Sequence, residues 1–85
     1  MPRGRQRAED RLEEIALRAA QGHALRAIAR ELGFSYRQVA TRFRTIRTQL
    51  AELTGDPIWL SSEGKTVVEC ARRWCGEHDV EVPEP

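Results

Sequence analysis

Apolar residues recur at helical spacing along most of the chain, and this pattern predicts four helices at about 8–21, 25–32, 36–54 and 63–78. The strongest periodic signal lies in the third stretch. Its apolar positions are separated by four, three, four and three residues and are expected to face the core: Val39, Phe43, Ile46, Leu50 and Leu53. We therefore expect an all-α fold.

The second and third helices are expected to form a helix-turn-helix. Gly33 supplies a C-terminal stop for the second helix, and Ser35 with Gln38 has the form of a capping box at the start of the third. A further stop follows at Gly55 and Pro57. In a helix-turn-helix, the second helix of the pair can lie in the DNA major groove. The sequence thus predicts a tetrahelical helix-turn-helix domain over residues 8–78.

The segment after the third helix has two interpretations. Ile58-Trp59-Leu60 forms a short apolar strap, expected to cover the open end of the core, and Ser61 or Ser62 can cap a fourth helix. The alternative is a winged helix, in which residues 58–68 form a short hairpin. Its apolar arms do not alternate cleanly, so we favour the helix.

Charge is distributed unevenly although the chain as a whole carries only +1. Residues 23–53 contain six arginines and two acids, whereas residues 54–85 contain three basic and seven acidic residues. Residues 1–7 form a basic arm that is expected to be mobile, and residues 79–85 form an acidic tail that is expected to be loose. A basic centre is typical of a surface that binds a polyanion.

Other classes of function find little support in the sequence. No apolar run approaches the roughly 20 residues of a membrane span, so we expect a cytoplasmic, nucleoid-associated protein. Cys70 and Cys75 have neither metal-pair spacing nor a common helix face, and we interpret them as small core residues. His23 and His78 are isolated, with no nucleophile, carboxylate pair or phosphate loop nearby in the sequence. We expect no enzyme activity, no metal and no cofactor.

The outward face of the third helix carries the candidate DNA contacts. Arginine can read guanine, glutamine can read adenine, and threonine can meet a thymine methyl. The predicted base contacts are Arg37, Gln38, Thr41, Arg42 and Thr45. The predicted phosphate contacts are His23, Arg26, Ser35, Tyr36, Arg44 and Arg47.

Residues 17–50 resemble the DNA-binding domain of LuxR-type (FixJ-type) regulators. The resemblance is carried by Gly22, Ile28, Ala29, Leu32, Gly33, Ser35, Val39, Phe43, Ile46 and Leu50. It implies a tetrahelical domain that binds inverted-repeat sites as a dimer, often through the fourth helix. The counterpart surface here consists of Val67, Val68, Ala71 and Trp74, to which the strap adds Trp59 as a dimer or partner surface. The chain departs from the family at two positions. The family usually has serine or threonine where Ala24 stands and threonine where Gln38 stands.

These observations predict a small transcriptional repressor of bacterial or phage origin that binds double-stranded DNA as a homodimer. With no sensor domain before the helix pair, we expect control by the protein's own concentration or by a protein partner. A different hypothesis is a helix-turn-helix interaction module that grips RNA polymerase, a sigma factor or another regulator through the strap and the acidic C-terminal third. A third is a phage DNA-processing factor such as an excisionase or a terminase small subunit.

Overall fold

The computed structural model describes residues 11–83 and has an all-α architecture there, as expected. Its elements, in chain order, are α1 (Leu12–Ala20), α2 (Leu25–Leu32), α3 (Tyr36–Thr54), the 3-10 helix η2 (Pro57–Leu60) and α4 (Val67–Glu77). The predicted bounds of α2 and α3 are confirmed. No strand occurs in residues 11–83, so the alternative hairpin over 58–68 is wrong.

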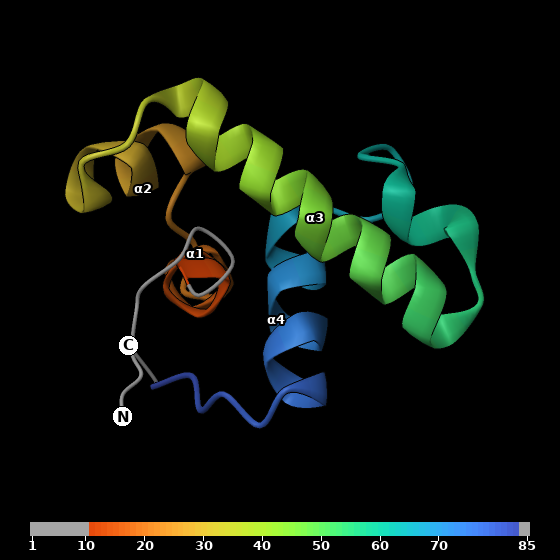
Figure 1. Ribbon diagram of the computed structural model, residues 1–85. Helices are drawn as coiled ribbons and strands as arrows, with labels where there is room; N and C mark the ends of the chain where they lie inside the picture. The colour runs from red at the N-terminus through yellow and green to blue at the C-terminus, as the bar shows by residue number, and fades with distance from the viewer. Residues whose placement is uncertain (1–10, 84–85) are drawn as a thin grey trace, which may run out of the picture.

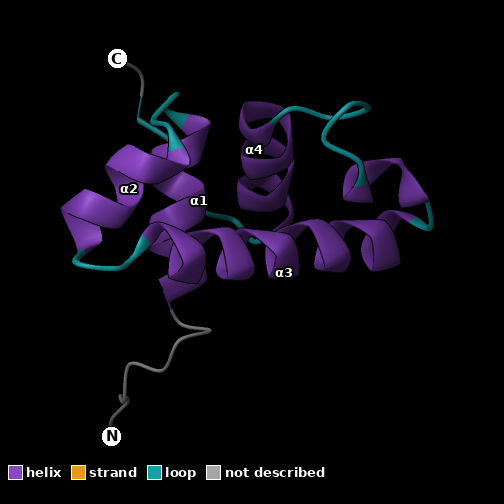
Figure 2. Cartoon of the chain, turned by 90° about the horizontal axis from the view of Figure 1, so that it is seen from above, coloured by secondary structure: helices purple, strands orange, loops and turns teal. Residues whose placement is uncertain are grey.

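The helix α3 organises the molecule. It crosses α1 and α4, while α2 packs against its N-terminal part (Figure 1). Seen from above, α2 and α4 lie on one side of α3, and α1 runs across beneath the N-terminal part of α3 (Figures 1 and 2). One long side of α3 is therefore left without another described helix against it.

The core lies where α1, α3 and α4 meet. The largest fully buried aliphatic side chains are Ile15, Ile28, Val39, Ile46 and Leu50. Burial of each such side chain contributes about 1.5–3 kcal/mol. Four of the five predicted inward positions of α3 are confirmed, because Phe43 is buried as well.

Leu53 is the exception in the apolar stripe of α3, because 58% of its surface is exposed. The C-terminal end of α3 extends past α4 in both views (Figures 1 and 2), so the last turn has no core beneath it. Leu53 instead lines a shallow hollow with Gln49, Glu52 and His78. The prediction that Leu53 faces the core is wrong.

The helix α4 begins at Val67, later than the predicted residue 63, because Thr66 is its cap. The Thr66 hydroxyl accepts from Glu69 N at 3.1 Å, and the Glu69 carboxylate accepts from Thr66 N at 2.9 Å. Ser61, one of the predicted caps, instead closes the preceding turn by accepting from Glu63 N and Gly64 N. Gly64 passes so close to Ile58 that an added Cβ would lie 2.6 Å from Ile58 Cγ1.

The chain after α4 folds back onto the core. Val80 N donates to Cys75 O at 2.8 Å, and Val80 and Val82 pack half-buried against the core while Glu81 between them is exposed. The expectation of a loose tail is therefore wrong for residues 79–83, because alternate valines in an extended segment reach the same apolar surface. The predicted arm at 1–7, the start of the first helix at 8–10, and residues 84–85 lie outside the described residues.

Candidate nucleic-acid interface

A short, rigid turn sets the angle between α2 and α3. Gly33 adopts φ 78°, a left-handed conformation that favours glycine, and Phe34 N donates back to Ala29 O at 2.8 Å. The predicted capping box follows. Gln38 N donates to Ser35 Oγ at 3.1 Å, and Ser35 N donates to Gln38 Oε1 at 2.9 Å. The first turn of α3 is thus fixed by the residues that are themselves candidate DNA contacts.

The outward face of α3 is polar and exposed. It consists of Arg37, Gln38, Thr41, Arg44, Thr45 and Thr48. No acidic residue occurs in α3 before Glu52. We call these six residues the α3 face. Four of the five predicted base contacts belong to it, and its length and charge suit a groove lined with phosphates.

The side-chain amide of Gln38 takes part in the capping box and is also a candidate contact to a DNA base. Its Oε1 accepts from the Ser35 backbone, whereas its side-chain nitrogen keeps both donors, with no acceptor among residues 11–83. A carbonyl oxygen has two lone pairs, so the cap leaves one acceptor position as well. The amide can therefore present a donor and an acceptor to a base edge while the capping box stays closed.

Arg42, the fifth predicted base contact, lies on the flank of α3 and is half-buried. Its Nη1 donates to Gln38 O at 3.1 Å, and its guanidinium carbon lies 4.7 Å from the centre of the Phe34 ring. The Nε atom is buried and has no hydrogen-bond partner in the described part of the chain. Arg42 thus braces the turn by stacking on Phe34, and it does not belong to the α3 face.

Arg11 joins the same stack, although no predicted site includes it. Its guanidinium lies 4.9 Å from the Phe34 ring centre and also forms an ion pair with Glu14 at 3.0 Å. Two arginines from distant parts of the sequence therefore contact the one aromatic side chain in the turn. No local sequence signal could have indicated this contact, because only the packing of α1 against the helix-turn-helix creates it.

The prediction that Arg47 contacts a phosphate is wrong, because only 8% of its surface is exposed. Its Nη1 lies 3.0 Å from Trp59 O, 3.3 Å from Ser61 O and 3.2 Å from Cys70 Sγ. The guanidinium also lies 5.4 Å from the Phe43 ring centre. Arg47 faces η2 and α4 and ties these elements to α3, so it cannot meet a phosphate in this fold.

Four of the other predicted phosphate contacts are exposed: Arg26, Ser35 and Tyr36 lie at or near the turn, and Arg44 lies further along α3. Among them, the Arg26 guanidinium stacks 4.7 Å from the Tyr36 ring centre. This stack links the outer side of α2 to the first residue of α3.

His23, the remaining predicted phosphate contact, is engaged with its own chain. Its Nδ1 lies 3.2 Å from Glu31 Oε1, and the same oxygen accepts from Arg18 Nε at 3.1 Å. A carboxylate beside the imidazole disfavours the approach of a phosphate. His23 is therefore the weakest candidate of the phosphate set.

The predicted dimer or partner surface is largely core. Trp59, Ala71 and Trp74 are buried, and Val67 and Val68 are half-buried. Trp74 Nε1 donates to Gln49 Oε1 at 2.8 Å, which directs the indole toward α3. The prediction that Trp59, Ala71 and Trp74 form a surface is wrong, because the apolar side of α4 is used to close the domain.

The strap covers the open end of the core only in part. Trp59 is buried and lies beneath Lys65 and Arg73, whose charged groups are 4.9 and 5.7 Å from its ring centre. Its neighbours Ile58 and Leu60 are 40% and 51% exposed. One strap residue thus packs inward and two remain available at the surface.

Both cysteines are free and buried, as their interpretation as core residues requires. Burial raises the pKa of both thiols above 9.0. In residues 11–83 no group of three or more His, Cys, Asp or Glu side chains is placed to hold a metal ion. No helix in the same residues has the length and apolar character needed to cross a membrane.

Comparison with known proteins found no matching family model, no matching curated protein and no matching solved structure.

Proposed function

We propose that this chain binds double-stranded DNA sequence-specifically by placing the N-terminal half of α3 in the major groove. The observation that carries this proposal is the uncovered α3 face, with its arginines, glutamine and threonines, opposite an apolar stripe that is buried. Arg37, Gln38 and Thr41 are the candidate base contacts nearest the start of the helix, and Thr45 lies one turn further along. Residues near the start of a recognition helix usually reach the bases.

Phosphate contacts in this proposal come from both sides of the turn. Ser35 and Tyr36 lie at the start of α3, Arg26 stacks on Tyr36, and Arg44 lies on the α3 face. Such contacts position a protein on the duplex but carry no sequence information. In the simplest version, the protein is a repressor that acts by occupying a promoter.

The test is selection of bound duplexes from a random pool, followed by binding measurements on the selected site with three variants. Arg37→Ala removes a bidentate donor, Thr41→Val removes a hydroxyl at nearly constant shape, and Gln38→Glu keeps the capping acceptor but places negative charge at the groove. Each good bidentate contact contributes about 1–3 kcal/mol of discrimination, so we expect the preference for the selected site to fall about 5- to 150-fold with Arg37→Ala.

Arg73→Ala is the matched control, because Arg73 is an exposed arginine on α4 that pairs with Glu77 at 2.8 Å. It should leave the preference unchanged. Equal selectivity of the wild type and all three α3 variants would reject the proposed base contacts, and the absence of any duplex binding above background would reject the function.

The homodimer remains part of the proposal, although Ala71 and Trp74 of α4 are buried and do not supply its surface. Large apolar side chains that stay exposed lie near the C-terminal end of α3, at Leu53, Ile58 and Leu60. A symmetric selected site together with sedimentation as a dimer on that site would support it. A single asymmetric half-site bound by one copy would contradict it.

The second candidate function is a protein-interaction module, which the exposed Ile58 and Leu60 favour. Salt separates the two functions. Binding to phosphates weakens steeply between low and moderate salt, whereas apolar docking does not. Ile58→Ser with Leu60→Ser should abolish docking to a protein partner and leave DNA binding intact.

A further inference from the structure

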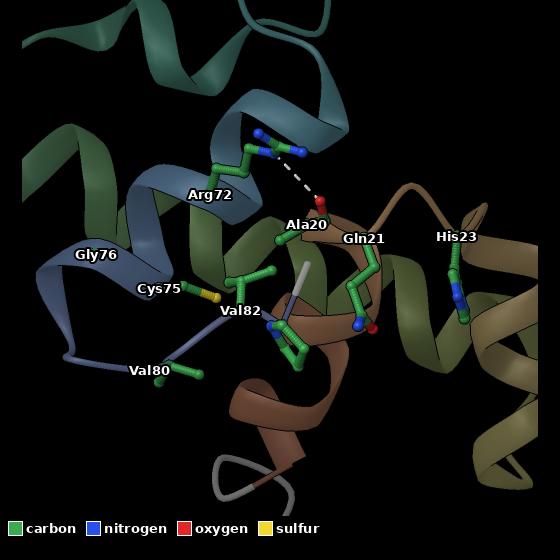
Figure 3. A pocket seen from close by; sticks show the side chains of 9 residues that line it. Ala20, Gln21, His23, Arg72, Cys75, Gly76, Val80 and Val82 are labelled. Atoms are coloured by element: carbon green, nitrogen blue, oxygen red, sulfur yellow. Dashed lines mark hydrogen bonds between the residues drawn. The ribbon is translucent and has the colours of Figure 1, made fainter. Parts of the chain in front are cut away.

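A pocket of about 500 Å³ lies between the end of α1, α4 and the C-terminal segment (Figure 3). Its volume falls in the range of about 300–1,000 Å³ that is usual for small-molecule sites. It lies away from the α3 face, and none of the residues assigned above to base contacts lines it. The pocket is therefore separate from the proposed base contacts, and of the predicted phosphate contacts only His23, the weakest candidate, lines it.

Much of the pocket wall is apolar. Val80, Val82 and Pro83 come from the C-terminal segment, and Cys75 and Ala20 come from α4 and α1. Glu81, between the two valines, is exposed and does not line the pocket. The extended segment thus presents its apolar side chains to the pocket and its carboxylate to solvent.

Arg72 supplies the anchoring cation at one edge of the pocket. Its Nε donates to Ala20 O at 3.2 Å, at the C-terminal end of α1, which fixes the plane of the guanidinium (Figure 3). The two terminal nitrogens have no acceptor among residues 11–83. A fixed guanidinium with free terminal N–H groups matches the geometry of a carboxylate.

The other polar lining groups add little positive charge. His23 lies at another part of the pocket, and its Nδ1 already contacts the Glu31 carboxylate. Gln21 is neutral. Within residues 11–83, the pocket therefore combines one cation that pairs with no carboxylate with an apolar wall, which suits a single negative charge on an apolar body and not a multiply charged phosphate.

We propose that this pocket binds a small organic monocarboxylate, with the carboxylate on Arg72 and the apolar body against Val80 and Val82. This inference goes beyond the proposed DNA binding and does not depend on it.

The probe is 4-phenylbutyrate, titrated into the full 15N-labelled chain and followed by two-dimensional NMR. We expect saturable shifts centred on the amides of Gln21, Cys75, Val80 and Val82. For a ligand of about twelve non-hydrogen atoms, we expect a Kd below about 1 mM. The uncharged 4-phenylbutyramide should bind at least tenfold more weakly if the charge is recognised.

Arg72→Gln should weaken binding at least tenfold, whereas Arg73→Gln, at the next position of α4, should bind like the wild type. Because Arg72 also contacts α1, Val82→Asp provides a second variant that leaves every helix unchanged and places a carboxylate in the apolar wall. It should abolish binding, and it decides the matter if Arg72→Gln does not fold.

Three outcomes overturn the proposal. They are the absence of localised shifts at about 10 mM probe, equal affinity for the acid and the amide, and unchanged binding by folded Arg72→Gln or Val82→Asp.

Discussion

Two arginines three positions apart on α3 have opposite surroundings. Arg44 is exposed on the α3 face, whereas Arg47 is buried and donates to Trp59 O from inside the domain. Ser61 O also accepts from Gly64 N and Lys65 N, so Trp59 O depends most on Arg47. At the scale of single residues, the direction from the helix axis decides whether an arginine stabilises the fold or meets a ligand.

Replacing Arg47 with methionine should lower the free energy of unfolding by about 1–3 kcal/mol, because Trp59 O is left buried without its N–H donor. Methionine keeps most of the aliphatic bulk, so the loss reports the hydrogen bonds more than the packing. Urea unfolding followed by circular dichroism measures it.

The matched control is Arg44→Met, which should change stability by less than about 0.5 kcal/mol because Arg44 is exposed. If both variants unfold at the wild-type urea midpoint, Arg47 does not hold η2 and α4 in place.

At the scale of elements, α3 and α4 both begin with a capping box. Ser35 with Gln38, and Thr66 with Glu69, both form complete capping boxes. The helix α2 has no side-chain cap, because Ala24 stands at its cap position. The two longest helices are thus fixed at their first turns by side chains, and α2 depends on packing.

Thr66→Ala should destabilise the protein by about 1 kcal/mol, because the N–H of Glu69 loses its acceptor in the first turn of α4. Thermal unfolding measures the change. Ser62→Ala is the control, since Ser62 was a predicted cap but is exposed and lies outside the box. A larger loss for Ser62→Ala than for Thr66→Ala would show that α4 is capped elsewhere.

The box of α4 also predicts a pH dependence. The backbone hydrogen bond from Thr66 lowers the pKa of Glu69 below its ordinary value of 4.5. A carboxylate whose pKa is lower in the folded state stabilises that state above its unfolded pKa and loses the effect as pH falls through the folded pKa. Glu69→Gln should therefore be less stable than the wild type at neutral pH, and the difference should shrink as pH falls below 4.5 and through the lower folded pKa.

A pH series of urea midpoints for the wild type and Glu69→Gln tests this sign. A difference that grows on acidification contradicts it.

The bounds of α2 and α3 were predictable because local signals agree there. Gly33 and Gly55 both adopt positive φ at the helix ends, and Ser35 closes its box with Gln38. The start of α4 carries a signal of the same kind, which the sequence prediction missed. Of the three hydroxyl residues Ser61, Ser62 and Thr66, only Thr66 has a glutamate or glutamine three positions later, and it closes its box with Glu69.

The exposed face of α3 was also predictable from the sequence, but the predictions for the residues at its edges were wrong. The buried stripe of α3 fixes the opposite face, so Arg37, Thr41 and Arg44 are exposed as expected. Residues on the flanks depend on where the other elements pack. Arg47 faces η2 and α4, and Arg42 faces Phe34, and neither contact follows from the periodicity of α3 alone.

At the scale of the whole molecule, the central segment is basic and the segment from residue 54 onward is acidic, although the net charge is only +1. The α3 face contains no acid, while acidic residues such as Glu69, Glu77 and Glu81 occur on α4 and beyond. A molecule with this distribution should meet a polyanion in a preferred orientation.

This charge distribution predicts a linear fall of log K for DNA with log salt, with a slope near −0.9 for each phosphate contacted. Arg44→Ala should reduce the magnitude of that slope by about 1 and weaken all duplexes alike. Fluorescence anisotropy across a range of salt concentrations measures both. Binding that does not respond to salt contradicts the phosphate contacts and favours apolar docking.

The reaction rates of the buried thiols can measure how often the native protein opens. Cys70 and Cys75 are 0% and 1% exposed, and burial raises the pKa of each. A water-soluble disulfide reagent can therefore reach Cys70 only when the helices part, so its rate of thiol exchange counts openings of the native protein, whereas Cys75 also lines the pocket beside the C-terminal segment. Cys70 touches Arg47 and Cys75 lies beside the C-terminal segment. Cys70 thus reports the separation of α4 from Arg47 of α3, and its exchange should be slower than that of Cys75, with no label added.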